Sequence, residues 1–216
     1  MMFGSPAEQR KITLDLIRHG EPEGGVRYRG SIDDPLSESG WQQMRFATEQ
    51  AMAAGTCWDA IISSPMQRCQ AFASELAQAR KLPLTVQPDL RELCFGELEG
   101  LTPKDAWAQY PELLQRLWED PELHTPPGGE LFTEFSARIS ASLDQILASP
   151  PGDHILVVVH GGVIRSALSH FIHLTPKDSF RVDVPYAGMT RFKIYLEEDG
   201  QYNAALSFIN RFTGKP

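Results

Sequence analysis

Cysteine is scarce in this chain of 216 residues, and the three that occur, Cys57, Cys69 and Cys94, form no CxxC pair. An odd, dispersed set argues against a disulfide framework and fits a reducing compartment. Long apolar runs are missing too, because stretches such as ILVVV are far too short to span a bilayer. The N-terminus, MMFGSPAEQRK, lacks the apolar region of a signal peptide. These absences predict a soluble cytoplasmic protein.

An excess of basic residues is also absent. The formal net charge is -8, and the lysines and arginines are scattered along the chain. This balance weighs against nucleic acid or an anionic membrane surface as the main partner. With 42% hydrophobic residues and no repeat or linker, residues 1–216 are expected to form one domain around one sizeable core. The oligomeric state, monomer or dimer, stays open at this point.

Strand and helix patterns alternate along the chain. Apolar runs predict strands at residues 11–17, 58–64, 82–87, 154–160, 189–196 and 204–211, the last two as edge strands. Amphipathic patterns predict helices at residues 36–55, 64–81, 130–149 and 161–172. Alternation of this kind is typical of a largely parallel sheet covered on both faces. The predicted fold class is therefore α/β, a three-layer α/β/α sandwich.

Capping residues support the first two of these helices. Ser37 is expected to be the N-cap of the first helix, and Gly55 is expected to end it. In the second, Ser64 at the N-cap, Pro65 at the first position and Gln67 match a capping box. Residues 95–131, rich in Pro, Trp and acidic residues, break the alternation, and we interpret them as a small helical lid inserted over one edge of the sheet.

Charged side chains gather where the predicted strands end. Arg18 and His19 end the first strand, and His160 ends the most apolar one. Arg68 lies in the first turn of the helix that follows the second strand, and Glu92 comes shortly after the third. In open α/β sheets, ligands bind beyond the carboxyl ends of the strands. We therefore expect these five side chains to converge on one rim.

This set of side chains suits a phosphoryl group. Arginine forks match phosphate oxygens, and helix N-termini after Gly20, Ser64 and Gly161 would supply free N–H groups. The glycines would let the backbone approach the ligand closely. A histidine kept neutral by neighbouring arginines is a nucleophile, and a carboxylic acid can protonate a leaving oxygen and then deprotonate water. The arginines and His160 would neutralise the developing charge, so no metal or other cofactor is required.

The motifs LIRHGEP, YRGSIDDPLSESG, SSPMQRCQAFA, LRELCFGELEG, PPGGE and VVVHGGVIRSAL, in this order, resemble the histidine phosphatase (phosphoglycerate-mutase-like) superfamily. The resemblance covers residues 12 to about 170. It implies that His19 becomes phosphorylated, that Arg18, Arg68 and His160 hold the phosphoryl oxygens, and that Glu92 is the proton donor and then the base. It also implies that Gly20 and Gly161 are substrate-binding backbone positions, and that the partner is a small phosphorylated metabolite.

Within that family, the FGELEG and PPGGE pieces look most like alpha-ribazole phosphatases. The resemblance to phosphoglycerate mutases is weaker, because EPEGGVRYRG lacks the Trp-Asn that usually follows their RHGES. The segment 95–131 holds eight acids against Lys104 and Arg116, and acids facing the site would repel a second phosphate. We therefore predict hydrolysis of a phosphomonoester whose leaving group is neutral or cationic. The alternatives are a phosphoglycerate mutase, a catalytically silent phospholigand-binding protein and a protein phosphatase.

Several neighbouring residues have no assigned role from sequence. Glu97 and Glu99 are rivals of Glu92. Arg27, Tyr28 and Arg29 could touch the leaving group or lie in a solvated loop, and Arg165 could reach the site or pair with an acid on the surface. His170 and His173 have no acidic or cysteine ligand placed to complete a metal site, so they are interpreted as structural. Cys69 does not lead a CxxxxxR phosphate loop and is interpreted as helix packing.

Overall fold

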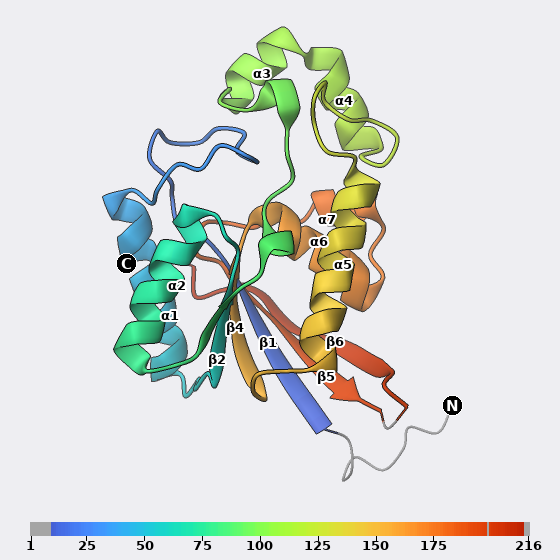
Figure 1. Ribbon diagram of the computed structural model, residues 1–216. Coiled ribbons are helices and arrows are strands. Elements are labelled where there is room, and N and C mark those ends of the chain that lie inside the picture. The colour runs from blue at the N-terminus through green and yellow to red at the C-terminus, as the bar shows by residue number, and fades with distance from the viewer. Residues whose placement is uncertain (1–9, 198, 214–216) are drawn as a thin grey trace.

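A computed structural model of the protein describes residues 10–197 and 199–213, so the N-terminal residues on which the signal-peptide prediction rests lie mostly outside it. The described chain contains one sheet, whose strands fan out between two groups of helices (Figure 1). The strands are β1 (Arg10–Arg18), β2 (Ala60–Ser63), β3 (Leu84–Val86), β4 (His154–Val159), β5 (Met189–Leu196) and β6 (Tyr202–Arg211). They follow the order β3-β2-β4-β1-β5-β6 across the sheet.

The sheet is mainly parallel. Strands β3, β2, β4 and β1 run in one direction, and β5 and β6 add an antiparallel hairpin beside β1. The expected α/β sandwich is therefore confirmed. One detail was wrong: β5 is not an edge strand, because it pairs with β1 on one side and with β6 on the other.

Helices cover both faces of the sheet. One face carries α1 (Glu38–Ala53) and α2 (Gln67–Arg80), and the other carries α5 (Phe132–Ala148) and α6 (Gly161–Ile172) (Figure 1). Side chains of a strand alternate between the two faces. In β4, Ile155, Val157 and Val159 pack in the cluster with α5 and α6, while Leu156 and Val158 pack in the cluster with α1 and α2. This double burial explains why the strand is an uninterrupted apolar run.

The remaining elements lie mostly beyond the carboxyl ends of the parallel strands. They are the short 3-10 turns η1 (Pro88–Leu90) and η2 (Gly96–Leu98) and the helices α3 (Pro103–Gln109), α4 (Pro111–Glu119) and α7 (Pro176–Phe180). We had expected the segment 95–131 to lie over one edge of the sheet. Helices α3 and α4 lie instead above the strand ends (Figure 1). None of the helices in the described ranges has the length and apolarity that crossing a bilayer requires.

One of the two predicted helix caps is confirmed. The Ser37 side chain accepts a hydrogen bond of 3.0 Å from the Gly40 N–H, and Gly55, at φ +88°, follows the end of α1. The capping box at Ser64 was wrong. Helix α2 begins at Gln67, and the Ser64 hydroxyl instead lies 2.7 Å from His160 Nε2.

A buried ion cluster links β1, β4 and β5 at a distance from the strand ends that carry the histidines. The Asp15 carboxylate, fully buried in β1, accepts hydrogen bonds from Arg191 at 2.6 and 2.8 Å and from the Trp58 indole at 2.8 Å. His154 Nε2 lies 2.8 Å from the same carboxylate. Burial alone raises the pKa of Asp15, but the Arg191 and His154 partners outweigh it and hold that pKa below its ordinary value. The cluster therefore keeps a charge inside an otherwise apolar strand.

We expect Asp15→Ala to lower the free energy of unfolding by about 3–5 kcal/mol, because it leaves Arg191 and His154 without their shared anion. Urea unfolding followed by circular dichroism measures this loss. Asp153→Ala is the matched control, since its ion pair with Arg10 at 2.8 Å is exposed and is expected to contribute no more than about 1 kcal/mol. Equal losses in the two variants would contradict the assignment.

Candidate active site

The two strand-end histidines are brought side by side by strand pairing. Arg18 of β1 is in register with Val159 of β4, and the His19 N–H donates to the Val159 carbonyl at 2.9 Å. The ring centroids of His19 and His160 consequently lie 5.2 Å apart, and the rings meet edge to face. His19 Nδ1 lies 2.7 Å from the Gly20 carbonyl, which accepts hydrogen bonds but cannot donate them. Nδ1 therefore carries the proton, and a neutral His19 has its lone pair on Nε2.

Both histidines are held in the neutral form. Burial lowers the pKa of His19 well below 6.5, and the nearby Arg18 and Arg68 charges lower it further. Burial also lowers the pKa of His160, again with help from Arg68. Desolvation and positive neighbours both disfavour the imidazolium, so the His19 Nε2 lone pair is available at neutral pH.

The buried Arg68 and the half-buried Arg18 supply the positive charge. Arg68 has no exposed surface, and its guanidinium donates to the Ile32 carbonyl at 2.8 Å and the Gly30 carbonyl at 3.3 Å. Arg18 donates to the Val184 carbonyl at 2.5 Å and stacks 4.2 Å from the Tyr186 ring centroid. The Nε–H groups of both arginines are buried and have no acceptor among the described residues, so each retains a donor suited to an oxyanion.

Gly20 has a structural reason to be glycine. A Cβ there would lie 2.2 Å from the Gly40 carbonyl oxygen, and a Cβ on Gly40 would lie 2.1 Å from the Glu21 carbonyl oxygen. These two glycines allow the segment after β1 to lie directly on the first turn of α1. The expected helix start after Gly20 was wrong, because α1 begins only at Glu38. The expected helix start after β4 is present, with His160 as the N-cap of α6.

Glu92 meets the start of α6. Its carboxylate accepts the Gly162 N–H at 3.0 Å and the Leu93 N–H at 3.0 Å. A Cβ on Gly162 would lie 2.3 Å from Glu92 Oε1, so glycine is what permits this approach. At Gly161, by contrast, the nearest atom to an added Cβ is Arg18 Nε at 3.6 Å, an ordinary contact. Gly162 was not singled out from sequence, although its place in the HGG triplet was a usable signal.

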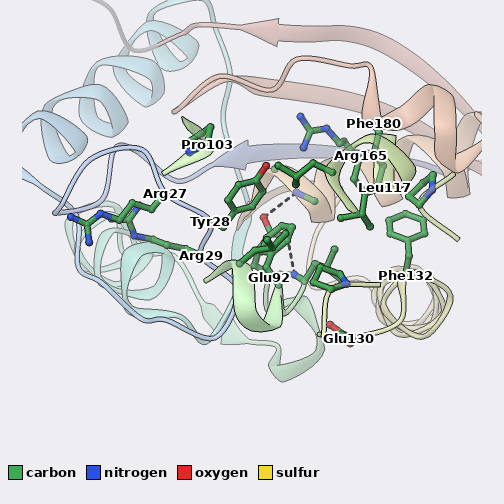
Figure 2. A pocket seen from close by; sticks show the side chains of 18 of the residues that line it. Arg27, Tyr28, Arg29, Glu92, Pro103, Leu117, Glu130, Phe132, Arg165 and Phe180 are labelled. Carbon is green, nitrogen blue, oxygen red and sulfur yellow. Dashed lines mark hydrogen bonds between the residues drawn. The ribbon is translucent and has the colours of Figure 1, made fainter. Parts of the chain in front are cut away.

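A cavity of about 400 Å³ opens at this point. Four of the residues singled out from sequence line it: Arg18, His19, Glu92 and Gly161. Arg68 and His160 lie behind this surface, fully buried, and Gly20 is not part of the lining. The three arginines left open by sequence all line the cavity (Figure 2); they are Arg27, Arg29 and Arg165.

The outer part of the cavity is mostly apolar. Figure 2 shows Leu117, Phe132 and Phe180 grouped together, and the last two rings meet at 5.2 Å. Of the eight acids in residues 95–131, all within the described chain, Glu130 alone lines the cavity. The expectation that an acidic lid faces the reaction site was therefore wrong, because this segment presents mainly apolar side chains there and seven of its eight acids lie outside the cavity lining.

The rival acids have structural partners. Glu99 accepts from Ser31 Oγ at 2.7 Å and from the Phe95 N–H at 3.0 Å, and Glu97 accepts from Tyr110 at 3.2 Å. Neither lines the cavity, which leaves Glu92 as the better placed acid.

Cys69 lies beside His160 but is not poised for reaction. Its sulfur is 3.4 Å from the Val159 carbonyl, and burial raises the pKa of its thiol. A thiolate is the reactive form of cysteine, so packing remains the better interpretation. His170 Nε2, for its part, lies 2.9 Å from Asp144 and 2.7 Å from the Tyr202 hydroxyl.

A strand-end histidine, two neighbouring arginines and a carboxylate around one cavity are the kinds of group that phosphoryl transfer requires. The chain belongs to the histidine phosphatase superfamily (branch 1), whose family profile matches residues 14–204. Its relatives and the similar solved structures include phosphatases and mutases, and the chain is an enzyme of this phosphatase type.

Three relatives show how the family's functions are distributed around this sequence. A 2,3-bisphosphoglycerate-dependent phosphoglycerate mutase of Rhizobium etli is 30% identical over 190 residues, which cover 84% of this chain and 90% of the mutase. A metal-independent phosphoserine phosphatase of Arabidopsis thaliana is 32% identical over 163 residues, 74% of this chain and 68% of that protein. A bifunctional protein of Mycobacterium tuberculosis is 33% identical over 186 residues, which cover 85% of this chain and 50% of that protein.

Solved structures agree with the fold. A mycobacterial glucosyl-3-phosphoglycerate phosphatase superposes with a TM-score of 0.79 at 25% identity, covering 93% of this chain and 99% of its own. An alpha-ribazole phosphatase from Shigella flexneri superposes with a TM-score of 0.76 at 24% identity, covering 95% of this chain and 99% of its own. The second likeness concerns the fold alone.

The neutral histidines make stability depend on pH. Because the folded-state pKa of His19 and of His160 lies below 6.5, the unfolded chain binds more protons in mild acid. The contribution of each histidine is complete above pH 6.5 and is lost as the pH falls from there. We expect a loss of up to about 1.4 kcal/mol per pH unit for each histidine, measured by urea unfolding at a series of pH values. His19→Gln should show a shallower slope than the wild type, with the exposed His173→Gln as control; an unchanged slope in His19→Gln would contradict the assignment.

Gly162→Ala is expected to displace the Glu92 carboxylate and lower kcat/KM by roughly 10²-fold, a typical contribution of a general acid. The new methyl group overlaps mainly the carboxylate end of the flexible Glu92 side chain and lies 3.3 Å from Phe135 Cζ, so the loss of melting temperature should be small compared with the loss of activity. Gly161→Ala is the comparison, and it should lose much less activity because its methyl group has room. Similar losses in both variants would mean that Gly162 acts on the helix start and not on Glu92.

Proposed function

We propose that the protein hydrolyses phosphomonoesters through a phosphohistidine formed on His19. In the first step, Nε2 of His19 attacks phosphorus, and the bond from phosphorus to the leaving oxygen breaks while protonated Glu92 gives that oxygen its proton. In the second, the Glu92 carboxylate takes a proton from water, whose oxygen attacks phosphorus and breaks the bond to His19. Inorganic phosphate is released and Glu92 is again protonated. The observation that carries this proposal is a neutral imidazole and a carboxylate lining one cavity.

Charge stabilisation is supplied by the chain itself in this proposal. The half-buried Arg18, the fully buried Arg68 and the neutral His160 lie near His19, where negative charge would spread over the phosphoryl oxygens. Preorganised donors in a buried site need no rearrangement as charge develops, which is why such groups contribute strongly to catalysis. We accordingly propose a metal-independent reaction without a cofactor.

The substrate we propose is a soluble metabolite whose leaving group carries an apolar or aromatic body. Support comes from the side of the cavity away from His19, where side chains from α4, α5, α7 and the η2 region present apolar surface: Phe95, Leu114, Leu117, Trp118, Phe132 and Phe180. A bare sugar acid or amino acid would leave this surface uncovered. Alpha-ribazole phosphate, with an aromatic base on its ribose, is our first candidate. Three free cysteines fit a reducing compartment, and we propose the cytoplasm.

A mutase is the second candidate, because the Rhizobium etli relative carries that name and extra arginines line the cavity. Those arginines are partly engaged: Arg29 is bound to Asp34 at 2.6 Å and to two backbone carbonyls, and Arg165 donates to the Val182 carbonyl at 3.0 Å. Arg27 and Arg165 could still receive the carboxylate of a phosphoglycerate. Hydrolysis is favoured because, among the described residues, the rest of the lining contains no further lysine or arginine for a second anionic end, and Glu130 there is acidic.

Phosphate release from a panel of esters, measured with EDTA present, tests the proposal. The panel contains alpha-ribazole phosphate, p-nitrophenyl phosphate, phosphoserine, glycerol phosphate and 3-phosphoglycerate with and without 2,3-bisphosphoglycerate. We expect turnover to persist in EDTA, to favour the esters with an aromatic body by about tenfold or more, and to fall roughly 10³-fold or more in His19→Ala.

Other outcomes select among the alternatives. Interconversion of phosphoglycerates that needs the bisphosphate primer would assign a mutase. An absence of turnover on every ester, combined with a phosphate-dependent rise in melting temperature, would assign a binding protein. Full activity in His19→Ala would refute the phosphohistidine route.

A further inference from the structure

The PPGGE motif at residues 126–130 has no part in the reaction proposed above, yet its glutamate lines the cavity. We propose that Glu130 and Arg138 form a clamp that positions the general acid Glu92 by holding the backbone on both sides of it. Both are positioning residues, since neither has to touch the substrate to act. The inference rests on the proposed function, in which Glu92 protonates the leaving oxygen.

Arg138 holds the backbone that leads to the acid. Lying in α5, it donates from Nη1 to the Asp89 carbonyl at 2.5 Å and the Arg91 carbonyl at 2.8 Å. Its Nη2 donates to the carbonyl of Glu92 itself at 3.1 Å. Residues 91–95 lie in neither a helix nor a strand, so no regular ladder of hydrogen bonds supports them. One side chain therefore replaces the backbone pairing that this stretch lacks.

Glu130 holds Arg138 in the orientation needed for this. Its two carboxylate oxygens accept from Arg138 Nε at 2.7 Å and Nη2 at 2.8 Å, a bidentate fork. The pair is shielded, with 12% of the Arg138 side chain and 14% of the Glu130 side chain exposed. Glu130 also holds the chain just after Glu92, because the Glu130 N–H donates to the Cys94 carbonyl at 3.0 Å. The clamp thus grips the chain before and after the acid.

The clamp stays charged over a wide pH range. Burial alone raises the pKa of Glu130, but the hydrogen bond and charge of Arg138 outweigh it and keep that pKa below its ordinary value. With the Glu92 backbone held by Arg138 and its carboxylate held by the Gly162 N–H at 3.0 Å, both ends of the acid have a fixed partner. Small displacements of a catalytic group cost a large share of its effect, so this restraint bears on rate.

Leaving-group dependence separates positioning of the acid from general stabilisation. An alkyl phosphate has a poor leaving group and needs the proton from Glu92, whereas p-nitrophenyl phosphate leaves readily without it. We expect Arg138→Gln to lower kcat/KM for 2-phenylethyl phosphate by about 10²-fold and for p-nitrophenyl phosphate by less than about threefold. The ratio of the two values does not depend on how much of the variant is folded. Arg138→Lys keeps the charge but loses the fork, and it should recover part of the ratio.

Glu92→Gln provides the benchmark. It should change the ratio in the same direction, and adding Arg138→Gln to it should produce no further change, because the clamp acts only through the acid. Arg45→Gln is the matched control, since Arg45 makes an equivalent fork with Glu75, at 3.0 and 3.0 Å, on the exposed face of α1 and α2. It should leave both esters at wild-type values.

Two results would overturn the inference in distinguishable ways. If Glu92→Gln shifts the ratio and Arg138→Gln lowers both esters equally, Arg138 stabilises the fold and does not position the acid, while the proposed function stands. If Glu92→Gln leaves the ratio unchanged in a protein that still loses activity in His19→Ala, Glu92 is not the general acid, and both the clamp and this part of the proposed function fail.

Discussion

The hydrogen bond from the His19 N–H to the Val159 carbonyl, at 2.9 Å, closes the pairing of β1 with β4 at the end where the site lies. This bond sets the relative position of His19 and His160. The bond continues the parallel ladder past the last paired residues, so the two histidines leave neighbouring strands at the same level and their rings lie 5.2 Å apart. A side chain at a strand end held by such a ladder has little freedom to move, so the proposed nucleophile would need little reorganisation to react.

Concentrating positive charge around buried imidazoles works against stability. Desolvation penalises each guanidinium, and Arg68 offsets this with bonds to the Ile32 and Gly30 carbonyls. Further from the strand ends, the buried charge of Asp15 is offset by a different kind of partner, because the Arg191 guanidinium donates to both of its oxygens. The middle and the end of β1 therefore differ: Asp15 is paired with Arg191, whereas the Nε–H of Arg18 has no acceptor among the described residues.

Residues 95–131, above the strand ends, are where the proposed enzyme would select its ester. Helix α4 has no buried residue, and its apolar side faces the cavity while its acids face outward. Trp118 is 56% exposed although it lines the cavity, a position in which an apolar ligand would remove more of its surface from water. In the proposed reaction, residues at the strand ends would bind the phosphoryl group, and residues of the elements above them would bind the leaving group.

Much of this was accessible from the sequence, because local patterns encode it: apolar runs marked the parallel strands, and residues just after them, such as His19 and His160, were bound to share one rim. Contacts between distant segments were not accessible. The Ser64 hydroxyl contacts His160 and does not cap a helix, Gly20 and Gly40 pack directly against each other, and every acid of residues 95–131 except Glu130 lies outside the cavity lining. Glu92 reaches Gly162 across 70 residues of chain. The sequence alone determined which chemical groups stand at the strand ends; only the tertiary structure decided which of them touch, because hydrogen bonds and close packing depend on positions in space that no local period specifies.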